Sequence, residues 1–232
     1  MKIYLASGNV NKKREMSEIF PNHTIITPKD QGISFNPVEN GKTFYENSII
    51  KAKALYDITL SPVIADDSGI CVDALDGGPG IYSSRYGGPD FMQGRSDGEK
   101  TSQEDQNRML IEQVNAVLKS GIDTSINKSQ GLFPNGPRSC RYVCAMVLYL
   151  GPSRIFVAQE TMEGILIDKI EDARGTGGFG YDPLFLIPGL GKTAAELTPE
   201  QKNSISHRGK AARVIQGMVK NISDFDEREG DK

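Results

Sequence analysis

The segment from Gly175 to Arg213 combines a glycine-rich loop with an aromatic ring, an acid and several hydrogen-bond donors. Four glycines fall within the six residues 175–180, where they surround Phe179 just before Asp182. A flexible backbone beside one ring suits a nucleotide, because the ring can stack on a base while donors meet phosphates or base acceptors. The glycines alone are weak support, since many glycine-rich loops are only turns. The donors follow later in the segment, at Lys202, His207 and Arg208.

A second group of candidate binding residues lies near the N-terminus, where a strand over residues 3–6 leads through a tight turn into a helix. Asn9 or Asn11 can cap that helix. The turn brings backbone N–H groups and the positive end of the helix dipole toward one point, which favours phosphate oxygens. The spacing is not that of a Walker A loop, and an ordinary helix cap with a solvated lysine is the structural alternative. The candidates are Ser7, Gly8, Asn9, Val10, Asn11 and Lys12.

Two adjacent acids, Asp66 and Asp67, follow a predicted buried strand over residues 63–65 and precede Ser68. Unpaired carboxylates there would cost stability, whereas Mg²⁺ would compensate them together with waters and substrate phosphates. Successive side chains of a strand point to opposite faces, so we expect the two acids to differ in function. The structural alternative is a polar turn.

Glu39 is a candidate second metal ligand in the loop before a helix that begins at Thr43. Glu46 competes for this role, but its position in a Thr-x-x-Glu capping box already gives it a structural reason. Lys51 shares a helix face with Asn47 and could reach phosphate, or could be a solvated lysine. The sequence shows no Ser-His-Asp arrangement and no candidate cysteine nucleophile, which favours direct attack by water.

The elements that must position these residues alternate between strands and helices, which predicts a mixed α/β fold. Residues 142–150 and 154–161 read as paired strands, residues 103–118 and 209–222 as helices, and the tail from Asp224 as frayed. We expect one continuous domain over residues 1–232, with a mixed twisted sheet, flanking helices and two lobes around a cleft. The polar stretch 120–139 is a candidate surface insertion.

Composition limits the class of protein. The chain of 232 residues has 38% apolar and 25% charged residues and a net charge of −3, which argues against a broad basic nucleic-acid surface. No apolar run approaches the ~20 residues of a membrane span, and the first residues lack a signal-peptide pattern. Three cysteines at irregular spacing predict reduced thiols in a cytoplasmic protein.

Taken together, the motifs closely resemble the inosine triphosphate pyrophosphatase family, whose members hydrolyse non-standard purine nucleoside triphosphates. The resemblance runs nearly end to end. Two departures are Ser7, where many members have threonine, and the stretch 120–139, which is longer than the usual connection. The matching segments are 7–12, 39–47, 65–69, 80–86, 175–182, 191–197 and 206–209.

The resemblance implies an elongated two-lobed α/β fold, a homodimer and dependence on Mg²⁺, with release of pyrophosphate and a nucleoside monophosphate from ITP, dITP or XTP. It implies that Glu39 and Asp67 hold the metal, with Asp67 as the catalytic base. Phe179 would stack on the purine. The remaining contacts that the resemblance implies are Ser7, Asn9 and Lys12 at the triphosphate, Ser68 at the nucleotide, Tyr181 and Asp182 around base and sugar, and Lys202, His207 and Arg208 at base and phosphate. Gly180 and Lys51 complete the candidate binding residues.

Base selection would follow from the 6-oxo acceptor of hypoxanthine and xanthine, which Arg208 can meet and which adenine lacks.

Two alternative functions stay open. A Maf-like nucleotide pyrophosphatase would have a similar cleft and other substrates, and a non-catalytic nucleotide sensor would need neither Asp67 nor a metal. An RNA-binding role is disfavoured by the acidic balance.

Overall fold

The computed structural model describes residues 1–121 and 136–229, with side chains up to residue 222. Its strands form a seven-stranded mixed sheet in the order β2-β1-β3-β4-β5-β6-β7. β1 is parallel to β2 and β3, whereas β6 is antiparallel to β5 and β7. The predicted mixed α/β class is therefore confirmed. The strands are β1 (Lys2–Leu5), β2 (Thr24–Ile26), β3 (Val63–Val72), β4 (Ser139–Tyr149), β5 (Ile155–Leu166), β6 (Phe185–Ile187) and β7 (Lys192–Thr193).

The helices agree with the predicted ones except at some ends. They are α1 (Val10–Ile19), α2 (Phe44–Thr59), α3 (Gln103–Lys119), α4 (Pro199–Ile205) and α5 (His207–Glu229). The last helix begins at His207 rather than Gly209 and continues through most of the charged tail that was expected to fray. The predicted insertion 120–139 falls largely on residues 122–135, which lie outside the described residues.

The chain divides into two compact units, which are described separately. Unit 1 comprises residues 1–67, 144–160 and 203–232, and unit 2 comprises residues 68–143 and 161–202. The strands β3, β4 and β5 each contribute residues to both. The expected single domain with a cleft stays a prediction.

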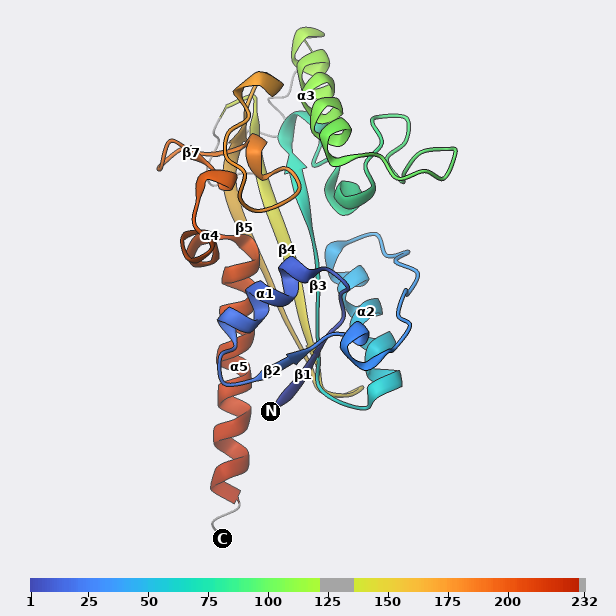
Figure 1. Ribbon diagram of the computed structural model, residues 1–232, viewed down its shortest axis with the longest axis vertical. Helices are drawn as coiled ribbons and strands as arrows, with labels where there is room; N and C mark the ends of the chain where they lie inside the picture. The colour runs from blue at the N-terminus through green and yellow to red at the C-terminus, as the bar shows by residue number, and fades with distance from the viewer. Residues whose placement is uncertain (122–135, 230–232) are drawn as a thin grey trace. The chain divides into compact units, whose positions relative to one another are not determined.

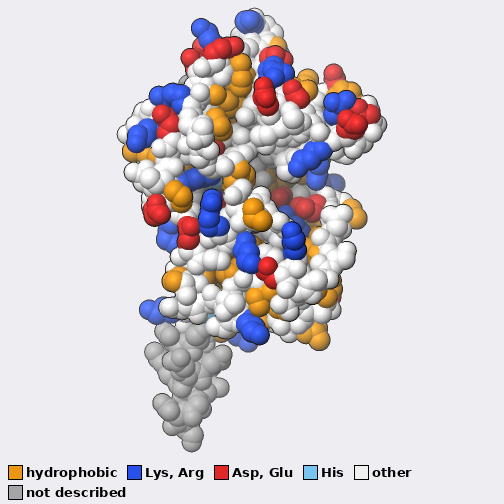
Figure 2. Space-filling view, in the orientation of Figure 1, with side chains coloured by type: hydrophobic (Ala, Val, Ile, Leu, Met, Phe, Trp, Pro, Cys, Tyr) orange, Lys and Arg blue, Asp and Glu red, His pale blue; other side chains and the backbone are white. Residues whose placement is uncertain are grey.

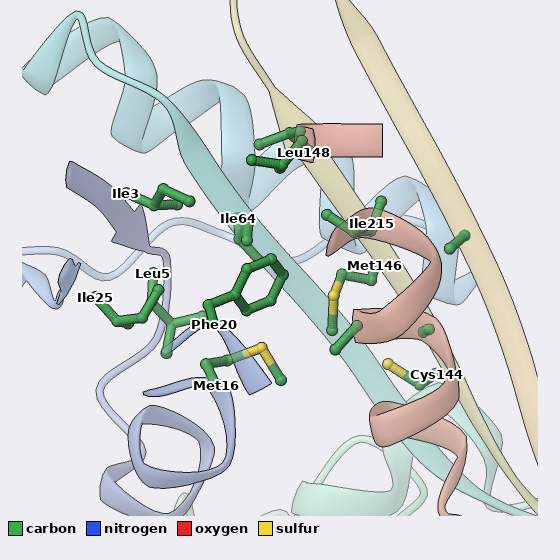
Figure 3. Close-up of a cluster of buried hydrophobic side chains, with 14 residues drawn as sticks. Ile3, Leu5, Met16, Phe20, Ile25, Ile64, Cys144, Met146, Leu148 and Ile215 are labelled. Atoms are coloured by element: carbon green, nitrogen blue, oxygen red, sulfur yellow. The ribbon is translucent and has the colours of Figure 1, made fainter. Parts of the chain in front are cut away.

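Unit 1 is a sheet covered on both faces (Figure 1). On one face α1 and α5 pack against the strands, through a core that includes Met16, Phe20, Ile64, Met146 and Ile215 (Figure 3). On the other face α2 packs against side chains that alternate with these along the same strands. Burial on both faces explains the nearly continuous apolar runs of the strands. The second core contains Ala6, Ala52, Leu55, Val63, Ala65, Val147 and Tyr149.

Unit 2 contains the remaining parts of the three long strands, together with α3, β6, β7 and several short 3₁₀ turns. α3 is capped by Ser102, whose hydroxyl accepts a hydrogen bond from the N–H of Asp105, and it buries Leu110 and Val114. Gly164 on β5 has no room for a side chain, because an added Cβ would lie 2.4 Å from the ring of Phe185. β5 and β6 therefore approach closely where β6 leaves the glycine-rich loop.

The distribution of charged side chains on the surface agrees with the small negative net charge of the sequence. On the face drawn in Figure 2, positive and negative side chains of the described residues are interspersed, without one broad basic area. None of the described helices is both long enough and apolar enough to cross a membrane. All three cysteines are free thiols, as expected.

Candidate functional site

The predicted phosphate turn connects β1 to α1, and Asn9 is the residue that caps the helix. Its Oδ1 accepts hydrogen bonds from the N–H groups of Asn11 at 2.9 Å and Lys12 at 3.4 Å. The Asn9 N–H in turn donates to the hydroxyl of Ser7 at 3.1 Å. A Cβ added at Gly8 would meet no atom within 4 Å. Capping of α1 by Asn9 therefore does not rule out that the same turn binds an anion.

Asp66 and Asp67 lie within β3 and not beyond its end, which corrects the predicted boundary after Ala65. Strand geometry continues to Val72, so the two carboxylates point to opposite faces of the sheet. Asp66 faces residues of α1 and α5, and Asp67 faces residues of α2. The expectation that the two acids have different functions therefore has a structural basis.

Asp66 is the centre of a buried ion cluster. Its Oδ2 lies 2.9 Å from Lys12 Nζ and 3.1 Å from Arg208 Nε, while Arg208 Nη1 lies 2.7 Å from Glu15 Oε2. Burial by itself would raise the pKa of Asp66, but Lys12 and Arg208 lower that pKa well below the usual carboxyl range. Asp66 therefore stays charged and joins β3 to both helices.

Asp67 has a different environment, formed by α2 and the loop before it. Asn47 Nδ2 donates to Asp67 Oδ2 at 3.1 Å, and Lys51 Nζ lies 3.3 Å from Asp67 Oδ1. Lys51 Nζ also lies 2.8 Å from Glu39 Oε2, so two carboxylates converge on one cation. Burial raises the pKa of Asp67 against the opposing effect of Lys51. A carboxylate of raised pKa is a better proton acceptor than an ordinary one.

The choice of Glu39 over Glu46 as a candidate metal ligand is consistent with the contacts of both side chains. The Thr43 hydroxyl accepts the N–H of Glu46 at 3.1 Å, as a cap requires. The Glu46 carboxylate accepts the N–H of Lys42 at 2.5 Å, whereas the expected box would direct it to Thr43. Glu46 is thus occupied at the helix start, and Glu39 faces Asp67 across Lys51.

The two carboxylates near Lys51, those of Glu39 and Asp67, fit a hard cation that binds together with the substrate. Within residues 1–121 and 136–229, no group of three or more His, Cys, Asp or Glu side chains forms a complete metal site. Two carboxylates that already converge on a positive charge match the usual ligation of Mg²⁺, in which one or two carboxylates are completed by waters and phosphate oxygens.

In unit 2 the glycine-rich loop is folded around Asp182. The Asp182 Oδ2 accepts hydrogen bonds from the Phe179 N–H at 2.7 Å and from Lys202 Nζ at 2.6 Å. Lys202 Nζ also lies 4.9 Å from the centre of the Phe179 ring. Gly178 is required, because it has φ +70° and an added Cβ would lie 2.0 Å from Asp182 Oδ2. Asp182 therefore orders the loop and fixes Lys202 beside the ring.

Tyr181 is buried, and its hydroxyl donates to the backbone carbonyl of Ser83 at 2.8 Å. Ser83 belongs to the segment 80–86, to which the sequence reasoning gave no role. Burial also raises the pKa of the Tyr181 hydroxyl beyond the range of ordinary tyrosines. This side chain therefore acts as a neutral hydrogen-bond donor within the unit.

The predicted site residues thus form two groups. Sequence reasoning missed Glu15 and Ser83, which are ordinary helix and turn residues until their partners are known. Asn47 could be recognised only because it shares a helix face with Lys51. The buried His207 begins α5, and Ser68 is half-buried immediately after Asp67. Unit 1 holds residues 7–12, Glu39, Lys51, Asp67, His207 and Arg208, and unit 2 holds Ser68, residues 179–182 and Lys202.

Comparison with known proteins agrees with these features. The dITP/XTP pyrophosphatase of Treponema denticola is 50% identical over 220 residues, which are 95% of this chain and 99% of that protein. The Escherichia coli protein of the same name is 38% identical over 95% of this chain and 98% of its own length. A HAM1 protein from Coxiella burnetii has a similar solved structure, with a TM-score of 0.75, 30% identity and coverage of 95% and 99%. Because residues 3–217 also match the Ham1 family, the chain belongs to that family.

Proposed function

We propose that this protein hydrolyses the non-standard purine nucleoside triphosphates ITP, dITP and XTP to the nucleoside monophosphate and pyrophosphate. The relatives that carry the name dITP/XTP pyrophosphatase support the substrate class. The observation that carries the chemistry is the convergence of Asp67 and Glu39 on Lys51, 3.3 and 2.8 Å from its Nζ. The reaction removes these nucleotides from the pool from which nucleic acids are made.

We infer that Glu39 and Asp67 hold Mg²⁺ together with the triphosphate. Mg²⁺ would neutralise charge on the phosphate oxygens during hydrolysis. Asp67 accepts a proton from the attacking water, for which its raised pKa suits it. Asn47 donates to one oxygen of Asp67 and leaves the other directed toward Lys51, which fixes the carboxylate plane. No cysteine or serine nucleophile is needed in this reaction.

The triphosphate would be bound by the turn at residues 7–12 and by the lysines. Lys12 contributes a charge that Asp66 holds in place at 2.9 Å, and Lys51 contributes a second. The positive end of α1 favours anions at the same turn. These groups bind phosphate without regard to the base.

In unit 2, the glycine-rich loop would contact the base. One face of the Phe179 ring would stack on the purine, and Lys202 lies near the Phe179 ring. We assign selection of the 6-oxo group to the segment His207–Arg208. Arg208 Nε and Nη1 are directed to Asp66 and Glu15, so these two donors position the guanidinium at the start of α5. The 6-amino group of adenine is itself a donor, so it and the protein's donor would both lack an acceptor.

The proposal includes a homodimer in the cytoplasm and no binding of nucleic acid or membrane. Light scattering on the purified chain tests the dimer: a mass of twice 25.3 kDa supports it, and the monomer mass contradicts it.

The direct test is pyrophosphate release from ITP, XTP, dITP, GTP and ATP, each with and without Mg²⁺. The proposal predicts fast release from the first three, slow release from ATP, whose base lacks the 6-oxo group, and none without the metal; the rate with GTP shows whether a 2-amino group is also rejected. Preference for nucleotides without a 6-oxo purine would favour a Maf-like specificity. Binding of ITP without release of pyrophosphate would indicate a nucleotide sensor.

A further inference from the structure

We propose that Ser83 is a positioning residue that holds the strand after Asp67 and the loop of Phe179 in register with each other. The inference rests on the proposed function, because it concerns how the same site is ordered. Ser83 lies in the short turn Gly80–Arg85 and is only 6% exposed. Its hydroxyl and its carbonyl contact two different segments of unit 2.

The hydroxyl of Ser83 makes the contact with the strand β3. It accepts the N–H of Ile70 at 2.9 Å and donates to the carbonyl of Gly80 at 2.6 Å. Ile70 lies on β3, three residues after Asp67 in the sequence. The hydroxyl thus binds the backbone of the strand that carries Asp67 and Ser68. Both of its functions, acceptor and donor, are used in a buried position.

Gly69 shows how closely the strand and the turn approach. A Cβ added at Gly69 would lie 2.2 Å from the Gly80 carbonyl oxygen and 2.4 Å from the Ser83 hydroxyl oxygen. Real Cβ atoms do not approach other atoms so closely, so any side chain here would separate β3 from the turn. The glycine that reads as a turn residue in the sequence is therefore needed for contact with Ser83.

The carbonyl of Ser83 belongs to the loop side of the link. It accepts the hydroxyl of Tyr181 at 2.8 Å, in a contact that is buried on both sides. Tyr181 lies between Phe179 and Asp182, and the N–H of Asp182 donates to the carbonyl of Phe179 at 3.4 Å. A shift of Tyr181 would therefore move the loop that presents the aromatic ring. One buried residue connects the segment beside the catalytic acid to the segment that would bind the base.

This link has a consequence for kinetics. Small displacements of reacting or binding groups cost as much as about 100-fold in rate, even when the change is remote from the reaction. Loss of the Ser83 hydroxyl leaves the Ile70 N–H and the Gly80 carbonyl without their partner, so the strand beside Asp67 shifts. Loss of the Tyr181 hydroxyl frees only the loop. The two changes should therefore affect kcat and KM differently.

The test compares four single variants and one double variant with the wild-type protein, using ITP and Mg²⁺ and a thermal melting curve for each. Ser83→Ala removes the hydroxyl, and Ser83→Thr retains it. Tyr181→Phe removes only the loop contact. Ser84→Ala is the matched control, because Ser84 is the neighbouring serine and is exposed.

We expect Ser83→Ala to lower kcat and raise KM, with kcat/KM reduced roughly 10- to 100-fold. Ser83→Thr should recover most of this loss, and Ser84→Ala should match the wild type. Tyr181→Phe should raise KM by roughly 3- to 10-fold with little change in kcat. The double variant Ser83→Ala/Tyr181→Phe should lose less than the product of the two single effects, because both act on one link.

The inference is overturned if folded Ser83→Ala has the kcat and KM of the wild type, even with a lowered melting temperature, since the residue would then only stabilise the fold. If Ser83→Ala does not fold, Tyr181→Phe decides: an unchanged KM overturns the link, and a raised KM supports it. Absence of turnover in the wild type and in Ser84→Ala would overturn the proposed function, and this inference with it.

Discussion

At the scale of single residues, the two adjacent aspartates show how one strand separates a structural acid from a catalytic one. Asp66 is 1% exposed, and its Oδ2 is paired with both Lys12 and Arg208. Burial raises the pKa of Asp67 above its ordinary value, although Lys51 and Asn47 act in the opposite direction. Alternation along a strand is visible in the sequence, and it predicts that the two differ. Which acid has which partners depends on contacts that the sequence does not show.

Asp66→Asn tests the structural half of this distinction. The amide keeps the shape but removes the negative charge, so Lys12 loses its carboxylate partner and the buried Arg208 keeps only its pair with Glu15. We expect the free energy of unfolding to fall by roughly 3–5 kcal/mol. Urea denaturation measures it, with Asp57→Asn as control, because Asp57 pairs with Lys53 on the surface. Equal stabilities of the two variants would contradict the assignment of Asp66.

Phe179→Ala tests the role of the ring. Every purine offers a face for stacking, so loss of the ring should weaken all substrates together. We expect kcat/KM for ITP and for ATP to fall by similar factors, which correspond to about 1–3 kcal/mol. Phe179→Tyr retains a ring of the same size and should stay near the wild type. A loss confined to ITP would show that Phe179 selects the base and does not merely stack on it.

At the scale of elements, the sequence predicts the helices and most strands because their apolar periods and caps are local. Asn9 and Thr43 cap helices as expected. The error at β3 has a physical reason: Gly69 is typical of a turn, but here it permits contact with Gly80 and Ser83. The cluster of Asp66 with Arg208 could not be predicted, since the partners are 142 residues apart in the sequence. Such long-range ion pairs leave no periodic pattern.

Gly209→Ala tests how the junction of α4 and α5 positions His207 and Arg208. An added Cβ would lie 1.9 Å from the carbonyl oxygen of Asn203, so the two helices would have to separate. We expect a loss of about 1–3 kcal/mol in stability, together with reduced turnover of ITP. The control on the same helix is Gly217→Ala, which meets nothing within 4 Å and should stabilise the protein by about 0.5–1 kcal/mol. If both variants behaved alike, close packing at the junction would not matter.

At the scale of the whole molecule, the residues proposed for function are distributed over two compact units, and three long strands contribute residues to each. The residues assigned to metal and phosphate belong to unit 1, and the loop assigned to the base belongs to unit 2. Asp67 and Ser68 are consecutive residues at the boundary on β3. The sequence resemblance predicts both groups of residues because their motifs are local. It leaves open how Asp182, Lys202 and Ser83 order the loop, since these contacts join distant segments.

Shortening the predicted insertion tests which part of it the fold requires. Replacing residues 122–135 by a short glycine-serine connection should leave Mg²⁺-dependent turnover of ITP within a few-fold of the wild type. Extending the deletion through residue 139 should damage the protein, because Arg138 Nη1 donates to the Ile167 carbonyl at 3.0 Å and Ser139 begins β4. Loss of turnover in a stable protein with the shorter deletion would assign residues 122–135 a role in the site.

The central claim is that this chain releases pyrophosphate from non-standard purine nucleotides with Asp67 as its catalytic base. The most direct measurement is kcat for ITP at saturating Mg²⁺ in the wild type and in Asp67→Asn, with folding checked by circular dichroism. Asparagine keeps the shape of the side chain and can still bond Asn47, but it can neither accept the proton nor hold the metal as a carboxylate. We predict at least a ~100-fold fall in kcat in a folded protein. Near-normal turnover of ITP by folded Asp67→Asn would contradict the account.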